Sequence, residues 1–100
     1  MTERAVQAMI SDNYLDSMIR AVRRSKTDAV AGEITDLILE ARADMIGAGV
    51  PAQKAENEKD PMVKGAIRSF VRWKFGLEAP GAESERRDYL VQVDNIRRRG

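Results

Sequence analysis

The sequence predicts an all-α fold, a small bundle of three to four short helices in one domain that spans residues 1–100. Three observations lead to this prediction. Apolar residues recur at spacings of three and four along most of the chain. Cap-type residues, glycines and prolines divide it into pieces of helical length. No convincing run alternates with a period of two, so strands are not expected.

The first predicted helix starts at Ser11-Asp12-Asn13, a run of cap-type residues, and residues 1–13 are expected to form an N-terminal extension. Its apolar residues fall on one helical face: Leu15, Met18, Ile19 and Val22. Cations crowd its end, where they suit the negative pole of the helix dipole: Arg20, Arg23, Arg24 and Lys26.

The second predicted helix starts at Thr27, a good N-cap, with Asp28 in the first turn. Gly47, Gly49 and Pro51 end it in the usual order of C-cap glycine before proline. Its apolar stripe consists of Val30, Ile34, Leu37, Ile38, Ala41 and Met45. We expect the polar segment 53–59 that follows to be a solvated, mobile loop.

The third predicted helix starts at Asp60-Pro61, an N-cap aspartate before a proline at the first helical position, and stops at Gly76. It holds three of the five aromatic residues, so we expect it at the centre of the core. Its apolar face consists of Val63, Ala66, Ile67, Phe70, Val71 and Trp73.

The last predicted helix is capped by Ser84, and we expect residues 97–100 to be a frayed basic tail. Its apolar residues lie on one side, where they either complete the core or dock a partner: Tyr89, Leu90, Val93 and Ile96. We expect the Arg97-Arg98-Arg99 run to be a solvated tail, with docking on an acidic partner as the alternative.

Composition excludes several kinds of chemistry. The chain has neither cysteine nor histidine, so it has no disulfide, thiolate nucleophile, imidazole base or histidine metal ligand. Its 17 basic and 16 acidic residues give a net charge of +1, which argues against a dedicated nucleic-acid binder. Gly47-Ala48-Gly49 lacks the rest of a phosphate-binding loop. We therefore predict no cofactor and no catalytic activity. We also expect no membrane association, because the sequence offers neither a signal peptide nor a span.

Charge is unevenly divided between the two central predicted helices. Residues 28–46 carry one cation and five carboxylates, whereas residues 61–76 carry four cations and no acid. Glu33, Asp36 and Glu40 share one side of the acidic helix. No glycine-bearing loop gathers these carboxylates, so a metal or acid–base site is not favoured. The basic row of Lys64, Arg68 and Arg72 is a solvated face, a contact for acidic groups of a neighbour, or a phosphate contact line.

The order of these signals resembles the head–tail connector proteins of tailed bacteriophages, an adaptor family often labelled DNA-packaging protein. The resemblance covers roughly residues 14–90. It is carried by Thr27-Asp28, Glu33-Ile34 and Asp36-Leu37-Ile38, by Ala43-Asp44 leading to Gly49-Val50, by Asp60-Pro61-Met62 through Phe75-Gly76, and by a last helix with Tyr89. The first dozen residues and the terminal arginine run do not match the pattern.

The resemblance implies a structural adaptor: a subunit of a homo-oligomeric ring at the virion head–tail junction, assembled in the bacterial host. Such a ring sits under the portal protein after packaging and meets tail-completion or stopper proteins on its other side. DNA passes through it without sequence readout. The alternative is a small helical DNA-binding module, a packaging or regulatory factor with the third helix as recognition helix.

The charge division suggests how copies of such a subunit could meet. A cyclic ring uses a heterologous interface, in which one face contacts a different face of the next copy. We expect the Lys64, Arg68 and Arg72 row of one subunit to approach the acidic row of its neighbour, formed by Glu33, Asp36 and Glu40. The alternative is that the two helices neutralise each other inside one subunit.

Overall fold

The computed structural model describes residues 10–75 and 81–99. Over these residues the chain is helical and contains no strand, which confirms the all-α prediction. The four long helices fall where four amphipathic segments were predicted, and one short helix was not foreseen. The elements are α2 (Asp12–Ala21), α3 (Asp28–Gly47), α4 (Ala52–Ala55), α5 (Pro61–Lys74) and α6 (Gly81–Arg99).

The predicted N-caps of α2, α3 and α5 are confirmed. The Ser11 and Thr27 hydroxyls and the Asp60 carboxylate each accept hydrogen bonds from backbone amides of the first turn. Pro61 occupies the first position of α5, where no amide hydrogen is needed. The cap bonds come from Tyr14 N at 3.2 Å, Val30 N at 3.1 Å, and Met62 N and Val63 N at 2.9 and 3.2 Å.

The predicted end of α3 is also confirmed, because the helix stops at Gly47 and Gly49 takes a φ of 108°, which suits glycine. Of the predicted N-terminal extension, residues 1–9 lie outside the described residues, while Asp12 and Asn13 belong to α2. The predicted stop at Gly76 also lies outside them; α5 ends at Lys74.

Both predicted ends of the last helix are wrong. The helix α6 begins at Gly81 rather than at Ser84, because Ala82 and Glu83 extend it and an acid suits a first turn. It does not fray at residue 97 but continues to Arg99. Asp94 holds the last turn through ion pairs with Arg97 at 2.6 Å and Arg98 at 3.0 Å.

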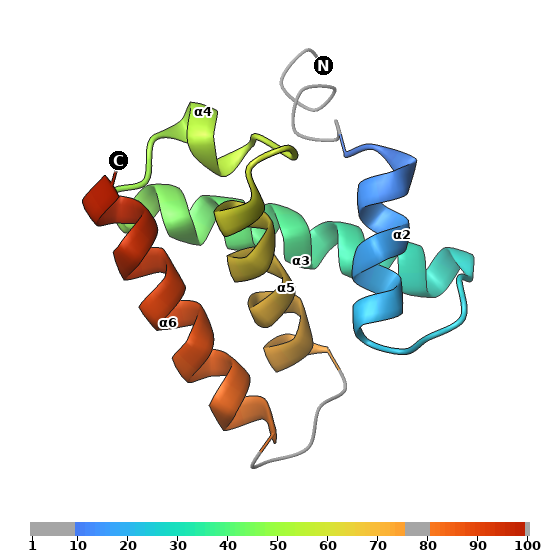
Figure 1. Ribbon diagram of the computed structural model, residues 1–100. Coiled ribbons are helices and arrows are strands. Elements are labelled where there is room, and N and C mark those ends of the chain that lie inside the picture. The colour runs from blue at the N-terminus through green and yellow to red at the C-terminus, as the bar shows by residue number, and fades with distance from the viewer. Residues whose placement is uncertain (1–9, 76–80, 100) are drawn as a thin grey trace.

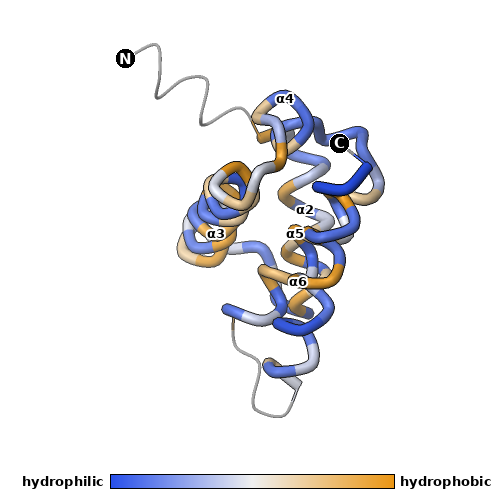
Figure 2. The backbone as a smooth tube through the Cα atoms, turned by 90° about the vertical axis from the view of Figure 1, so that its left-hand side faces the viewer, coloured by the Kyte–Doolittle hydropathy of each residue, from blue (hydrophilic) through white to orange (hydrophobic). Residues whose placement is uncertain are grey.

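The helices form a slab of two layers. Figure 1 shows α5 and α6 side by side and antiparallel, with α3 lying across them and across α2. Figure 2 shows α3 nearly end-on at one side, with α2, α5 and α6 on the other. The principal extents are 39 × 35 × 19 Å, so the molecule is thin across the layers. One face of α3 and one face of the α2–α5–α6 layer are therefore left to the outside.

The core lies between the layers and uses the predicted apolar faces, with α5 at its centre. Phe70 is 2% exposed and contacts the rings of Trp73 and Tyr89 edge-on. No helix in the described part of the chain is long and apolar enough to cross a membrane. The fully enclosed side chains include Met18, Ile34, Ile38, Met45, Val63, Ile67, Val71, Tyr89 and Ile96.

The prediction of a solvated, mobile loop over residues 53–59 is right about solvation at four of its positions but wrong in treating the whole segment as loop. The exposed positions are Gln53, Glu56, Asn57 and Lys59. Residues 52–55 form α4, and Ala55 is 1% exposed. Lys54 forms an ion pair with Asp60 at 2.8 Å, and Glu58 is bound to Ser11. Polar residues in this segment thus have specific partners, some of them distant in the sequence.

Candidate functional site

The acidic row on α3 is largely available on the surface. Glu33 and Asp36 are exposed and have no ion-pair partner within residues 10–75 and 81–99. Asp36 lies opposite the buried stripe of the helix by helical periodicity. Glu40 is 3.8 Å from Lys74 Nζ in a half-exposed ion pair. Among the described residues, two of the three predicted carboxylates therefore lie on the outside of the slab without an ion-pair partner.

The basic row on α5 divides into three different environments. Arg72 Nε donates to Glu85 of α6 at 2.7 Å, and its Nη1 donates to the Ala21 carbonyl of α2 at 2.8 Å. Lys64 Nζ lies 5.6 Å from the centre of the Tyr14 ring. Arg68 is exposed and, in the part of the chain that the structure describes, has no ion pair.

The two oppositely charged helices therefore neutralise each other only slightly within one chain. Among the described residues, Glu40 and Lys74 make the one ion pair between α3 and α5. Arg72 instead links α5 to α2 and α6. Arg68 on one layer, and Glu33 and Asp36 on the other, are exposed and make no ion pair within residues 10–75 and 81–99.

Three of the four residues considered for partner docking on α6 lie in the core of the chain itself. Tyr89, Val93 and Ile96 are 1%, 6% and 0% exposed, so they complete the core. Leu90 is 47% exposed and is the member of this set on the surface. It lines a groove between α3, α5 and α6.

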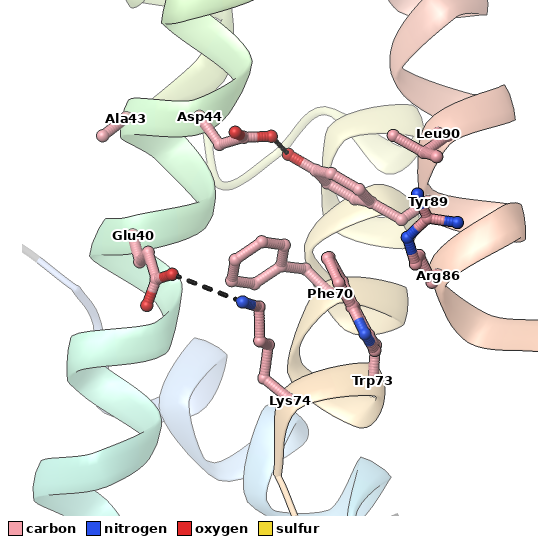
Figure 3. Close-up of a pocket in the computed structure, with 9 residues that line it drawn as sticks. All are labelled: Glu40, Ala43, Asp44, Phe70, Trp73, Lys74, Arg86, Tyr89 and Leu90. Carbon is pink, nitrogen blue, oxygen red and sulfur yellow. Dashed lines mark hydrogen bonds and ion pairs between the residues drawn. The ribbon is translucent and has the colours of Figure 1, made fainter. Parts of the chain in front are cut away.

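This groove, which we call the aromatic groove, has a volume of about 470 Å³ and is shown in Figure 3. Phe70, Trp73 and Tyr89 form its wall, with ring centres 5.0 to 6.2 Å apart. Lys74 Nζ lies 4.5 Å from the centre of the Trp73 ring. The remaining lining residues are Glu40, Ala43, Asp44, Arg86 and Leu90.

The polar groups of the aromatic groove hold the layers together. Tyr89 donates its hydroxyl to Asp44 Oδ2 at 2.6 Å, and the Glu40–Lys74 pair crosses the same gap. Burial first, and then the hydrogen bond to Asp44, raises the pKa of Tyr89 well above its usual range. A tyrosine that keeps its proton and gives it to a structural bond is poorly suited to acid–base catalysis.

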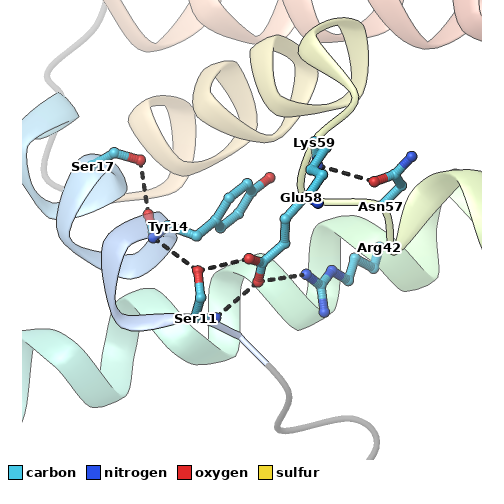
Figure 4. A network of polar contacts seen from close by, with 7 residues as sticks. All are labelled: Ser11, Tyr14, Ser17, Arg42, Asn57, Glu58 and Lys59. Atoms are coloured by element: carbon cyan, nitrogen blue, oxygen red, sulfur yellow. Dashed lines mark hydrogen bonds and ion pairs between the residues drawn. The ribbon is translucent and has the colours of Figure 1, made fainter.

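A second polar cluster was missed by sequence reasoning and is shown in Figure 4. Arg42 is only 6% exposed, and its Nη2 lies 3.7 Å from Glu58 Oε2. Glu58 also accepts hydrogen bonds from Ser11 N at 2.9 Å and Ser11 Oγ at 2.7 Å. This Ser11–Arg42–Glu58 cluster joins the start of α2, the inner side of α3 and the segment before α5. The signal available in the sequence was Arg42 itself, a lone cation four residues after Ile38 and therefore on the apolar face of the helix.

Tyr14 packs beside this cluster, and burial raises its pKa to about 12. A raised folded-state pKa stabilises the fold below the unfolded value of about 10, and the contribution disappears as the pH rises to 12. Between pH 10 and 12 this loss amounts to about 2–3 kcal/mol of unfolding free energy, and we expect it to be absent in Tyr14→Phe. Urea unfolding at pH 8 to 12 measures it, and an unchanged alkaline slope would contradict the assignment.

Comparison of the chain with protein-family models, with curated proteins and with solved structures gave no match. The functional interpretation therefore depends on the order of helix signals in the sequence and on the surfaces described above.

Proposed function

We propose that this protein is a structural adaptor, a subunit of the ring that connects the head and tail of a bacteriophage. The ring docks under the portal protein, meets a tail-completion or stopper protein, and continues the DNA channel. The proposal is carried by the ordered pair of capped helices, Thr27-Asp28 followed by Asp60-Pro61, which resembles the connector family. No catalytic step is part of this role.

The division of charge between the two layers supports assembly of this kind. The carboxylates of Glu33 and Asp36 are exposed on α3, and the Arg68 guanidinium is exposed on α5. A head-to-tail contact between copies would bring such groups together and can repeat around a closed ring. Exposed pairs contribute about 0–1 kcal/mol each, so they orient the contact more than they strengthen it.

The role of Arg72 differs from that of Arg68 in this interface. Because Arg72 bonds Glu85 and the Ala21 carbonyl, it holds three helices of one subunit together. We therefore assign the intersubunit contact to Arg68, with Lys64 beside it, on the basic side and to Glu33 and Asp36 on the acidic side. Reversal of Arg72 would test the fold rather than assembly.

The proposed function is tested with the purified chain, alone and mixed with the portal protein that this role requires. Solution mass and negative-stain imaging measure ring formation, and co-sedimentation measures docking on the portal. Rings or a portal complex are expected. A chain that stays monomeric at all concentrations and does not sediment with the portal would refute the proposal.

Reversing one charge of the interface should weaken assembly, and reversing its partner should restore it. We expect Arg68→Glu to shift the ring assembly midpoint to about 3–10-fold higher protein concentration, from one or two lost rim contacts and like-charge repulsion. In the double variant Arg68→Glu/Asp36→Arg, the assembly midpoint should return most of the way to its original value. Arg87→Glu is the matched control on α6. Equal assembly of all variants would contradict the assigned faces.

The DNA-binding module, the alternative function, requires α5 to present a recognition surface to a groove. Trp73 instead contacts Phe70 edge-on, and Arg72 is bound to α2 and α6. Arg68 is left as the exposed, unpaired cation of α5 within the described residues. These contacts favour the structural role over sequence readout by α5.

A further inference from the structure

The end of α2 carries a cluster of cations that the proposed ring contact does not use. Arg20, Arg23 and Arg24 are exposed, and in the described ranges none of them has an ion-pair partner. Arg20 and Arg24 line a hollow of about 250 Å³ together with Asp16, Ile19 and Lys26. We call the three arginines, Arg20, Arg23 and Arg24, the α2-end cluster.

Arg23 takes a conformation that disfavours its own side chain. Its φ is 58°, in the left-handed region, and it lies just after the α2 C-cap, where glycine is the usual residue. The backbone closes the helix there through Arg23 N to Arg20 O at 3.0 Å and Arg24 N to Ile19 O at 3.4 Å. An arginine at this position strains the backbone, so a long cationic side chain is present where glycine would fold more easily.

A helix C-terminus ordinarily repels anions, but at this end the carbonyl groups are already occupied. Ile19 and Arg20 accept the amide bonds of the closing turn. Arg72 Nη1 covers the Ala21 carbonyl at 2.8 Å. The negative pole is therefore capped by donors, and the arginines dominate the local charge.

The acids close to the cluster do not neutralise it. Asp16 is 3.0 Å from Lys26, and its hydrogen bond and charge raise the pKa of Lys26. Asp12 adds a smaller effect on Lys26. The Arg24 guanidinium is held 5.4 Å above the centre of the Phe75 ring, which orders the side chain without removing its charge. Arg20, Arg23 and Arg24 therefore present three charges around one turn, and none of them has an ion pair within residues 10–75 and 81–99.

We propose that the α2-end cluster binds the phosphodiester backbone of duplex DNA, without sequence readout. Guanidinium groups recognise phosphate oxygens, and three on one exposed turn suit consecutive phosphates. A lipid surface is a poorer fit, because the exposed large apolar residues of the described chain, Ile46, Leu90 and Val91, lie on α3 and α6. The choice of DNA rests on the proposed function, in which DNA passes through the ring.

The contact of one subunit is weak, and a ring would repeat it around the channel. Three phosphate contacts predict a slope of about −2.7 in the logarithm of affinity against the logarithm of salt concentration. The affinity of one subunit for DNA should then fall about 40-fold between 50 and 200 mM salt. Multiple copies on one duplex would raise the overall affinity without any new contact.

The test is a titration of the isotope-labelled full chain with a 12-base-pair duplex, followed by amide NMR shifts at several salt concentrations. The largest shifts are expected at residues 19–26 and at Phe75. In the triple variant Arg20→Ala/Arg23→Ala/Arg24→Ala the 40-fold salt dependence should largely disappear. The control variant Lys59→Ala/Arg87→Ala/Arg99→Ala removes the same amount of charge from other exposed sites, and it should keep the 40-fold salt dependence. Equal behaviour of the two triple variants would overturn the proposal.

The single variant Arg23→Gly separates binding from a purely structural role. It should raise the melting temperature by several degrees, because glycine accepts the positive φ. It should also reduce the salt dependence from about 40-fold to about 12-fold, the value for two contacts. Higher stability with unchanged salt dependence would overturn the proposal.

Two further measurements distinguish binding of DNA phosphates from binding of free phosphate. Inorganic phosphate at 20 mM should compete weakly with DNA for the same amides. Shifts with phosphate but none with DNA, or shifts with DNA confined to α5 and α6, would overturn the assignment. These measurements are made at a chain concentration at which solution mass shows a monomer, so their failure is independent of ring assembly.

Discussion

Replacing Phe70 with alanine should lower the free energy of unfolding by about 3–5 kcal/mol, the range for truncation of a buried aromatic side chain. Phe70 is 2% exposed and lies 5.0 and 5.4 Å, centre to centre, from the rings of Tyr89 and Trp73. The substitution removes apolar burial and both edge contacts, and it leaves a cavity between the layers. Domains of this size have about 5–15 kcal/mol in total, so much of the fold's stability is at stake.

Urea unfolding followed by circular dichroism at 222 nm measures this loss. Phe75→Ala is the matched control, because Phe75 is only partly buried at the end of α5. It should lose about 1–2 kcal/mol, since less apolar area is removed from contact. A Phe70→Ala loss no larger than that of Phe75→Ala would contradict the position of Phe70 at the centre of the core.

Local chemistry explains why most helix starts could be predicted from the sequence. Ser11, Thr27 and Asp60 each cap an amide two or three residues away, so the signal and its partner lie in the same short segment. The apolar stripes of α2, α3 and α5 are similarly local, because helical spacing alone determines which side chains share a face. The buried residues of these three stripes lie in one core, as helical spacing predicted.

The last helix shows the limit of cap residues as signals. Ser84 is a good N-cap type, yet α6 begins at Gly81, because Ala82 and Glu83 before Ser84 are good helix formers. The terminal arginines form helix because Asp94 lies one turn earlier and pairs with two of them. Both corrections depend on relations between neighbouring residues that a single cap signal does not include.

The polar contacts of the candidate surfaces could not be predicted, because their partners are distant in the sequence. Arg72 reaches the Ala21 carbonyl across 51 positions, and Glu58 reaches Ser11 across 47. A row of cations on one helix looks uniform in the sequence. The packing of α2 and α6 against α5 gives Arg72 a structural role and leaves Arg68 exposed.

The Ser11–Arg42–Glu58 cluster leads to the second large stability effect. Replacing Glu58 with glutamine removes the counter-charge of Arg42, whose side chain is 7% exposed. Breaking a buried ion pair by removing one partner costs about 3–5 kcal/mol. Since the Glu58 side chain is 24% exposed, we expect about 2–4 kcal/mol. Glutamine keeps one oxygen that can accept from Ser11 but replaces the second acceptor with an NH2 donor, so the loss includes one hydrogen bond as well as the charge.

Removing both charges should cost less than removing one. Arg42 Nε is buried and has no hydrogen-bond partner among the described residues, so the arginine is not fully compensated even with Glu58 present. We therefore expect Arg42→Met with Glu58→Gln to recover at least half of the stability lost by Glu58→Gln alone, because methionine preserves apolar volume without a charge to bury. Glu56→Gln, an exposed carboxylate in the same segment, is the control and should change stability by less than about 0.5 kcal/mol.

The double variant separates two roles for the buried arginine. If burial of its charge is the main cost, the pair Arg42→Met/Glu58→Gln unfolds at a higher urea concentration than Glu58→Gln. Additive losses would instead mean that the arginine stabilises α3 through its aliphatic stem and Nη groups, independently of Glu58. This cluster links the start of α2 to α3. In Glu58→Gln, the hydrogen exchange of α2 amides should therefore speed up, relative to the unsubstituted protein, more than that of α6 amides. That local loosening follows from the position of Ser11 at the α2 N-cap.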